Sequence, residues 1–181
     1  MDALAYLITF HAHGTWLHGH AAGSVDGRNN DPDTPLLPAD VAREGRARAL
    51  LRRPPGELDA RRRFVVHATV HEVCAQRAWR LHALHVRVTH VHAVVGARHA
   101  PERVMNDLKA YSTRRMREAG VLAADAEPWS HHGSTRYLNT QTSFDRAVEY
   151  VLHEQGAALD MTRPEAWVDR TAGMRRAGRG G

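Results

Sequence analysis

Residues 84–97 read L-H-V-R-V-T-H-V-H-A-V-V-G-A, and this stretch sets the frame of the fold. From Val91 onward it is almost entirely apolar, which is typical of a strand buried in a sheet. Side chains of a strand alternate between its two faces, so we expect His90 and His92 on the same face. Two imidazoles on a buried face need a partner, and neutral imidazole is a common ligand of divalent metals.

This histidine pair has to be weighed against the composition of the chain. With 14 histidines in 181 residues, about one H-x-H sequence is expected by chance, and the chain contains three. We interpret the other two, His11/His13 and His18/His20, as surface residues or as residues that face a bound partner. A solvated or hydrogen-bonded pair remains the alternative for the central one as well.

The length of the chain fits one domain with its own hydrophobic core. The single cysteine, Cys74, excludes an intramolecular disulfide and is typical of a reducing compartment. No apolar run is long enough to span a membrane, and residues 1–4 lack the basic start of a signal peptide. We therefore expect a cytoplasmic protein without membrane contacts.

The charge of the chain favours a polyanionic partner. The formal net charge is +5 and the isoelectric point is about 10.1. Arginine supplies nearly all of the cations, although this bias alone is weak evidence of phosphate recognition. The helix expected over residues 101–119 carries the densest group of cations, which could follow a phosphate backbone or form a solvated face. Its members are Lys109, Arg114, Arg115 and Arg117.

Hydrophobic periodicity predicts the order β, helices, β-β, α, β, α. The expected strands cover residues 4–12, 79–87, 91–97 and a short segment after a turn within 133–138. The expected helices cover residues 41–51, 58–78, 101–119 and a last one that starts at Thr142 with Asp145 and ends at Gly156. With right-handed crossovers this order gives an α+β fold, a ferredoxin-like βαββαβ core whose antiparallel sheet carries the helices on one face.

Two segments are expected to lie outside this core. Residues 19–40 are rich in Gly, Asp, Asn and Pro without periodicity, which predicts a flexible loop or a flap inserted after the first strand. Residues 161–181 are basic and glycine-rich towards their end, which is typical of a disordered tail. The predicted domain therefore covers residues 1–160.

The last helix carries a tyrosine and a carboxylate one turn apart. Tyr150 and Glu154 lie at the edge of an apolar stripe with helical spacing. Taken alone, an edge tyrosine beside a surface carboxylate is the simpler interpretation. Two imidazoles and a carboxylate, however, suit a divalent metal that polarises a phosphodiester. A phenol one turn from the carboxylate can then attack the phosphorus as a nucleophile.

Four stretches share the pattern of a known family. They are Y-L-I-T-F-H-A-H-G-T-W-L-H-G at 6–19, V-T-H-V-H-A-V-V at 88–95, L-K-A-Y-S-T-R-R-M at 108–116, and G-S-T-R-Y-L with Y-V-L-H-E-Q-G within 133–156. In these stretches the sequence resembles the single-tyrosine transposases of the HUH nuclease superfamily. It is most similar to the REP-associated tyrosine transposases and their insertion-sequence relatives.

The resemblance implies an enzyme that cuts and joins single-stranded DNA near small hairpins through a 5′-phosphotyrosine intermediate, with Mg²⁺ or Mn²⁺ as cofactor. It implies metal ligands at His90 and His92, the nucleophile at Tyr150 and a third ligand at Glu154. Insertion-sequence relatives often have glutamine at this last position, so Glu154 departs from the pattern. Arg136 in the fourth strand is expected to join the DNA contacts. Relatives act as monomers or as dimers with shared sites, so a homodimer is compatible with the resemblance.

Several alternatives remain open. Tyr111 is a competing nucleophile, but it falls at core spacing with Val104 and Leu108 and no carboxylate follows one turn later. His67 and His71 have zinc-binding spacing without a further ligand, so we interpret them as a structural or surface pair. The protein could also be a domesticated relative that binds hairpin DNA without cutting it, or a metal-binding hydrolase unrelated to nucleic acid.

Overall fold

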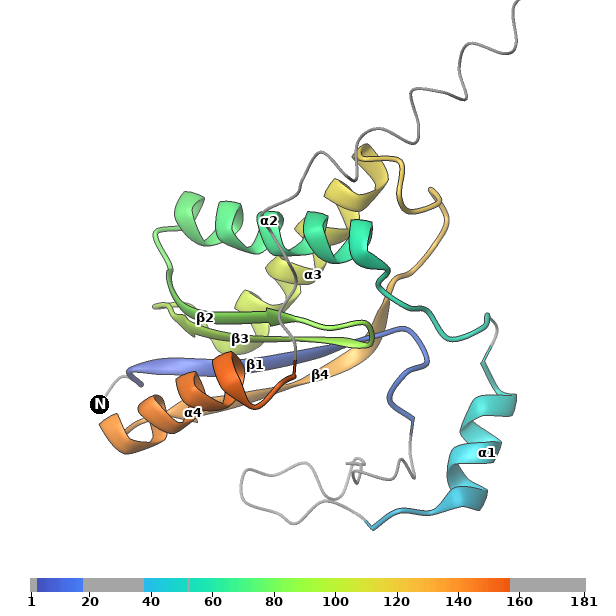
Figure 1. Ribbon diagram of the computed structural model, residues 1–181, viewed down its shortest axis with the longest axis horizontal. Helices are drawn as coiled ribbons and strands as arrows, with labels where there is room; N and C mark the ends of the chain where they lie inside the picture. Colours follow the sequence, from blue (N-terminus) through green and yellow to red (C-terminus); the bar gives the residue numbers. More distant parts are fainter. Residues whose placement is uncertain (1–2, 18–37, 52, 157–181) are drawn as a thin grey trace, which may run out of the picture.

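The core of the computed structural model, which describes residues 3–17, 38–51 and 53–156, is a four-stranded antiparallel sheet. Its strands lie in the order β2-β3-β1-β4 (Figure 1). They are β1 (Ala5–Ala12), β2 (Arg80–Val86), β3 (His90–Gly96) and β4 (Trp129–Leu138). This is the strand order of a ferredoxin-like βαββαβ core, so the predicted fold class is confirmed.

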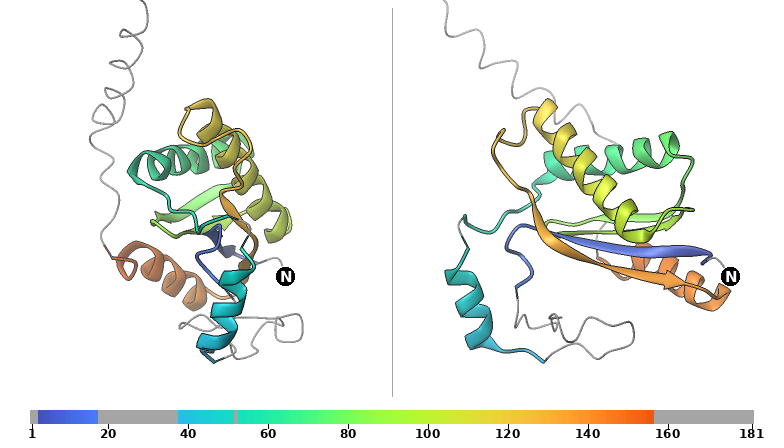
Figure 2. Two further views of the ribbon diagram at one scale, coloured as in Figure 1. Left: turned by 90° about the vertical axis from the view of Figure 1, so that its right-hand side faces the viewer. Right: turned by 180° about the vertical axis from the view of Figure 1, so that it is seen from behind.

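Four helices accompany the sheet in the described part of the chain, where the sequence predicted them. They are α1 (Val41–Ala49), α2 (Ala60–Gln76), α3 (Pro101–Glu118) and α4 (Gln141–His153). Helices α2 and α3 cover one face of the sheet, α4 covers the opposite face, and α1 stands apart from it (Figure 2). The prediction that the helices share one face is therefore wrong for α4. The reason is that alternate side chains of β1 and β3 are apolar on both faces.

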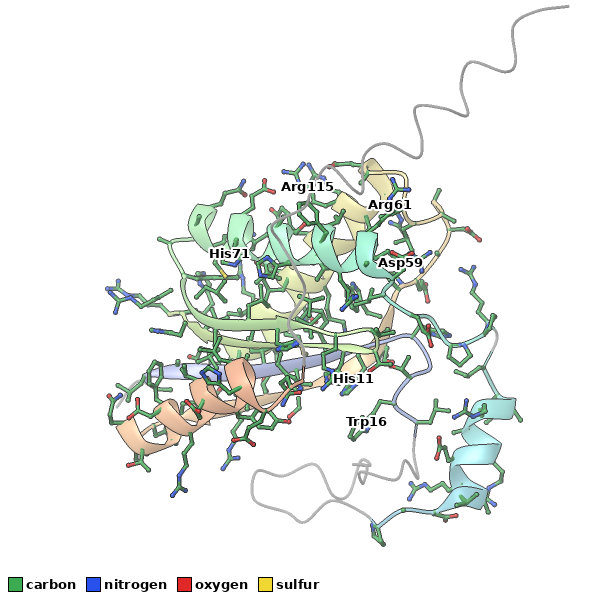
Figure 3. The ribbon with its side chains drawn as sticks, in the orientation of Figure 1. His11, Trp16, Asp59, Arg61, His71 and Arg115 are labelled. Atoms are coloured by element: carbon green, nitrogen blue, oxygen red, sulfur yellow. The ribbon has the colours of Figure 1, made fainter. Side chains whose placement is uncertain are left out.

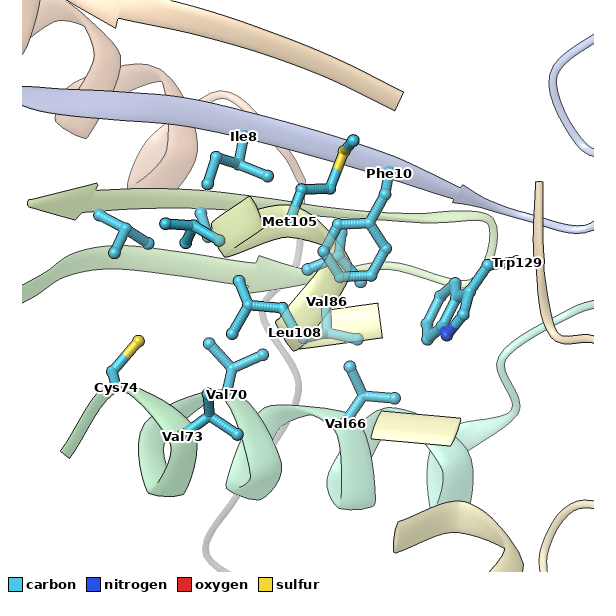
Figure 4. Close-up of a cluster of buried hydrophobic side chains, with 14 of the residues drawn as sticks. Ile8, Phe10, Val66, Val70, Val73, Cys74, Val86, Met105, Leu108 and Trp129 are labelled. Atoms are coloured by element: carbon cyan, nitrogen blue, oxygen red, sulfur yellow. The ribbon is translucent and has the colours of Figure 1, made fainter. Parts of the chain in front are cut away.

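The larger core lies between the sheet and the helices α2 and α3 (Figure 4). Ile8 and Phe10 on β1 point into it, and they pair across the sheet with Ala93 and Val91 of β3. Helix α2 contributes a row of buried side chains at helical spacing, which includes Val66, Val70 and Val73. Removing this apolar surface from water is the main force that holds the helices to the sheet.

The smaller core lies under α4 on the opposite face. It combines mostly small side chains of the sheet and the helix, namely Ala5, Ala83, Val94, Leu138, Ala147 and Val151. Val94 shares its face of β3 with His90 and His92, because side chains alternate along a strand. The apolar contacts of α4 therefore occupy one end of this face, and the two histidines occupy the other end, beneath the end of the helix.

Two boundaries differ from the sequence prediction. Strand β4 begins at Trp129, and Gly133 lies inside it rather than in a turn before it. The N-cap of α4 is Thr140, whose side chain and that of Ser143 cap each other's backbone N–H at 3.1 and 3.2 Å. The helix thus starts two residues before the expected Thr142, at the hydroxyl pair of Thr140 and Ser143.

The predicted loop at 19–40 and the predicted tail at 161–181 lie outside the described residues, apart from residues 38–40. In the described part, no helix combines the length and apolar character that crossing a membrane requires.

Candidate active site

His90 and His92 lie side by side on β3, with ring centroids 4.6 Å apart. His92 is buried and His90 is half-buried. The Nδ1 atom of His92 is 2.7 Å from Oγ1 of Thr9, and that of His90 is 2.9 Å from Oγ1 of Thr89. Each ring is thus held through Nδ1. Metal-binding histidines are usually held in this way, by a second hydrogen bond at the ring nitrogen that does not bind the metal.

Both imidazoles are kept neutral by their surroundings. Burial first, and then the nearby His90, His11, His85 and Arg87, together lower the pKa of His92 to about 3. Burial and Arg87 also lower the pKa of His90 from its ordinary value, while a hydrogen bond with the Gln155 side chain acts in the opposite direction. Neutral imidazole is the form that binds a metal, so the pair is ready to act as ligands at neutral pH.

Helix α4 brings Tyr150 to this pair. The ring centroids of Tyr150 and His92 are 5.5 Å apart, and the rings stand edge to face at 73°. The tyrosine is 37% exposed, so its face away from the sheet is open to solvent. Tyr111 instead lies on α3 across the sheet, where its ring contacts Arg77 and Arg114. Of the two candidate nucleophiles, the structure brings only Tyr150 to the histidines.

The end of α4 places a glutamine, not the expected glutamate, against the histidine pair. Glu154 is the C-cap residue of α4 and its side chain is exposed. Gln155 is buried, and its side chain bonds to the ring of His90. Gln155, rather than the expected Glu154, therefore faces the histidine pair. Sequence reasoning missed it because the helix was expected to continue to Gly156.

Two further side chains of β1 belong to the site. His11 pairs with His90 across the sheet, and their ring centroids are 5.3 Å apart. Its ring also lies 4.6 Å from that of Trp16, and Figure 3 shows the two at the same end of the sheet. Thr9, opposite His92, holds that ring. The period-two alternation of β1 could have placed both residues on one face, but only strand pairing shows which residues they meet.

The cations predicted to contact DNA from α3 are used within the fold and lie away from the histidines. Lys109 is buried, and its Nζ donates to the carbonyls of Ser130 at 2.7 Å and His131 at 3.1 Å. Arg115 forms ion pairs with Glu72 of α2 and with Glu118. Its place in Figure 3 is across the sheet from His11.

The two other arginines of the predicted group, Arg114 and Arg117, also have partners: Arg114 pairs with Glu118, and Arg117 donates to the carbonyl of Ala126. Arg136 differs from the α3 group. It is exposed on β4 and pairs with Leu7, a residue of the face that α4 covers. Arg136 therefore shares its side of the sheet with the histidine pair, unlike the cations of α3. Its contact with DNA stays a prediction.

Among the described residues, no group of three or more His, Cys, Asp or Glu side chains is placed to hold a metal. Two imidazoles and the amide oxygen of Gln155 are donor types that would fit a divalent metal, with Gln155 as the third protein donor. Mg²⁺ and Mn²⁺ prefer oxygen donors, which an amide and a phosphate both provide. His67 and His71 stack on α2, with ring centroids 4.7 Å apart, and stay a predicted structural pair.

Comparison with known proteins identifies the family. The model of a family described as "Transposase IS200 like" matches residues 57–151, which is more than half of the chain. The chain therefore belongs to the IS200-like transposase family, as its sequence motifs predicted. The matched range includes His90, His92 and Tyr150. The family consists of transposases, so the chain belongs to a class of enzymes that cut and join DNA.

Two solved structures are also similar. One is a REP-associated tyrosine transposase bound to a REP hairpin, with 9% identity and a TM-score of 0.41; the match covers 83% of this chain and 66% of that protein. The other is a candidate transposase from Deinococcus radiodurans R1, with 16% identity and a TM-score of 0.43, covering 83% of this chain and 90% of that one. A search of curated proteins found no significant match.

Proposed function

We propose that this transposase nicks and rejoins single-stranded DNA near small hairpins, with Tyr150 as the nucleophile. The observation that carries the proposal is the contact between the rings of Tyr150 and His92, because it places an accessible phenol beside two neutral imidazoles. Membership of a transposase family supports DNA as the substrate. The preference for hairpins and single strands is what the resemblance to the REP-associated tyrosine transposases implies.

Mg²⁺ or Mn²⁺ is the proposed cofactor, with His90, His92 and Gln155 as its protein ligands. When bound, the ion would polarise the scissile phosphate and stabilise its developing charge. Thr9 and Thr89 orient the two imidazoles, and burial keeps the imidazoles neutral. Glu154, the ligand expected from the sequence, is exposed in the structure and remains the alternative third ligand.

The chemical step is a transesterification at phosphorus. The oxygen of Tyr150 attacks the phosphorus as its proton passes to solvent at the exposed side of the ring. The bond from phosphorus to the 3′ oxygen of the preceding nucleotide breaks, and that oxygen takes up a proton and leaves as a free hydroxyl. The product is a 5′-phosphotyrosine. Attack by a 3′ hydroxyl on this intermediate restores the phenol and joins two strands.

The test is covalent capture of DNA. The protein is incubated with Mn²⁺ and a hairpin oligonucleotide that has single-stranded flanks, and the adduct is detected by its mass on a denaturing gel. We expect an adduct with the wild type and none with Tyr150→Phe. Tyr111→Phe and Tyr137→Phe are matched controls that should retain it, since neither tyrosine lies at the histidine pair. An adduct that persists in Tyr150→Phe would sink the assignment.

A second candidate function is hairpin binding without cleavage. It is favoured by the finding that, among the described residues, no group of three or more His, Cys, Asp or Glu side chains is placed to hold a metal. Tight binding of the same oligonucleotide with no adduct in any divalent metal would support it. Phosphate contacts make binding steeply dependent on salt, so salt-insensitive binding would instead favour a hydrolase unrelated to DNA.

The mass of the free protein in solution tests whether it is a homodimer.

A further inference from the structure

Strand β2 buries a histidine that the proposed chemistry does not use. His85 is 5% exposed and pairs with His92 in the register of β2 and β3. Its Nδ1 atom lies 3.2 Å from the backbone carbonyl of Val151. Val151 follows Tyr150 in the last turn of α4, so His85 connects the sheet directly to the turn that carries the proposed nucleophile.

The carbonyl that His85 meets is one that needs a partner from outside the helix. The last four carbonyls of a helix have no intrahelical donor, and α4 ends at His153. Val151 is fully buried, so water cannot readily serve its carbonyl. The Nδ1–H of His85 donates to this oxygen. The contact is thus a cap on α4 that comes from the sheet.

The hydrogen bond from His85 is directional, so it can fix the rotation of α4 about its axis, which apolar packing does not determine. Helix α4 rests on the sheet mainly through small apolar side chains, including Ala147 and Val151. Apolar contacts are non-directional and do not by themselves fix the rotation of a helix about its axis. A hydrogen bond to a backbone carbonyl in the last turn does. Rotation of this turn would move Tyr150 away from His92 and Gln155 away from His90.

We propose that His85 is a positioning residue, which fixes the last turn of α4 on the sheet and thereby places Tyr150 and Gln155 against the histidine pair. The proposal rests on the function proposed above for Tyr150. His85 itself touches neither the phosphate nor the nucleophile in this role. It acts through the backbone of Val151.

The variants separate the hydrogen bond from the space that the ring fills. In His85→Asn the amide N–H can take the place of Nδ1–H, whereas in His85→Gln the donor is displaced by one methylene group. His85→Leu fills the space without a donor. His82→Leu is the matched control, because His82 also lies on β2 and contacts α4, through Phe144.

The experiment uses the full chain of each variant. Single-turnover adduct formation and DNA affinity are measured with Mn²⁺ and the hairpin oligonucleotide, and amide exchange of residues 150–155 is measured without DNA. We expect His85→Leu and His85→Gln to slow adduct formation about tenfold, the effect of losing one hydrogen bond, with less than about a twofold change in DNA affinity. Exchange at the end of α4 should rise in the same two variants. His85→Asn should restore both rate and protection, and His82→Leu should alter neither.

Equal rates and equal exchange in His85→Asn and His85→Gln would overturn the proposal, and this comparison holds even if His85→Leu fails to fold. Exchange is measured without DNA, so it decides the role of His85 independently of catalysis. A wild type that forms no adduct contradicts the proposed function. The anchoring of α4 is then supported or overturned by the exchange data alone.

Discussion

At the scale of single residues, the end of α4 decides which side chain faces the histidines. The helix ends at His153, and Gly156 adopts the left-handed conformation with φ of 76°. Side chains after a helix end no longer follow the helical spacing of 3.6 residues per turn. Glu154 therefore faces solvent and Gln155 turns inward. The prediction that Glu154 is a ligand assumed that the helix continues through this residue.

Because Gln155 faces the histidines and Glu154 faces solvent, substitutions at these two neighbouring positions should differ in the size of their effect. Gln155→Ala should weaken Mn²⁺ binding, so that the Mn²⁺ concentration for half-maximal adduct formation rises by about tenfold or more. Glu154→Ala should leave it within about twofold, because the exposed carboxylate does not reach the histidines. A titration of Mn²⁺ against adduct yield measures both. If Glu154→Ala has the larger effect, the carboxylate is the third ligand after all.

At the scale of elements, β4 shows how a glycine can be misread. Glycine between polar residues is typical of a turn, but Gly133 pairs with Phe10 in the middle of β4. A Cβ atom there would meet Sδ of Met105 from α3 and would lie 2.6 Å from the carbonyl oxygen of Thr9. The residue is thus a place where helix and sheet approach closely. That proximity is a tertiary feature, which local sequence patterns do not record.

The same substitution should therefore have opposite effects on two elements. Gly133→Ala should lower the free energy of unfolding by about 1–3 kcal/mol, since the methyl group meets backbone that cannot move away. Gly45→Ala in α1 meets nothing within 4 Å. It should strengthen that helix by up to about 1 kcal/mol but leave global unfolding unchanged, because α1 in the described structure buries no side chain. Urea denaturation followed by near-UV and far-UV circular dichroism distinguishes the two. Similar losses in both variants would contradict this account.

At the scale of the whole molecule, the sequence predicted the order of the elements and three residues of the candidate site. Local periodicity was enough for the four helices and for the strands, and motif spacing was enough for His90, His92 and Tyr150. The partners Thr9 and His85 could not be predicted, because they depend on which strands pair and in which register. The side of the sheet that α4 covers is likewise a matter of packing, which periodicity does not determine.

The buried histidine pair should make the stability of the metal-free protein depend on pH. His92 has an ordinary pKa of 6.5 in the unfolded chain and a pKa of about 3 in the folded protein. Between these values the unfolded chain binds more protons, so the free energy of unfolding falls as the pH falls through this window. The slope reaches at most about 1.4 kcal/mol per pH unit for one such group.

Urea unfolding in the presence of a chelator, from pH 7.5 to pH 5, measures this slope above the range in which most carboxylates titrate. The His92→Gln variant should have a shallower slope than the wild type. An identical slope in the two proteins would show that His92 is protonated in the folded state.

The central position of β1 has a consequence for the protein as it is synthesised. Ala5–Ala12 leaves the ribosome before its two neighbours in the sheet, which are β3, near residue 90, and β4, which is complete only at Leu138. At about 5–20 residues per second, the nascent strand waits on the order of ten seconds before both of its edges are covered. Unpaired strand edges invite association with other chains. Both edges of β1 are therefore paired only once the last strand of the sheet has been made. We expect the protein to depend most on chaperones while the nascent chain still ends before β4.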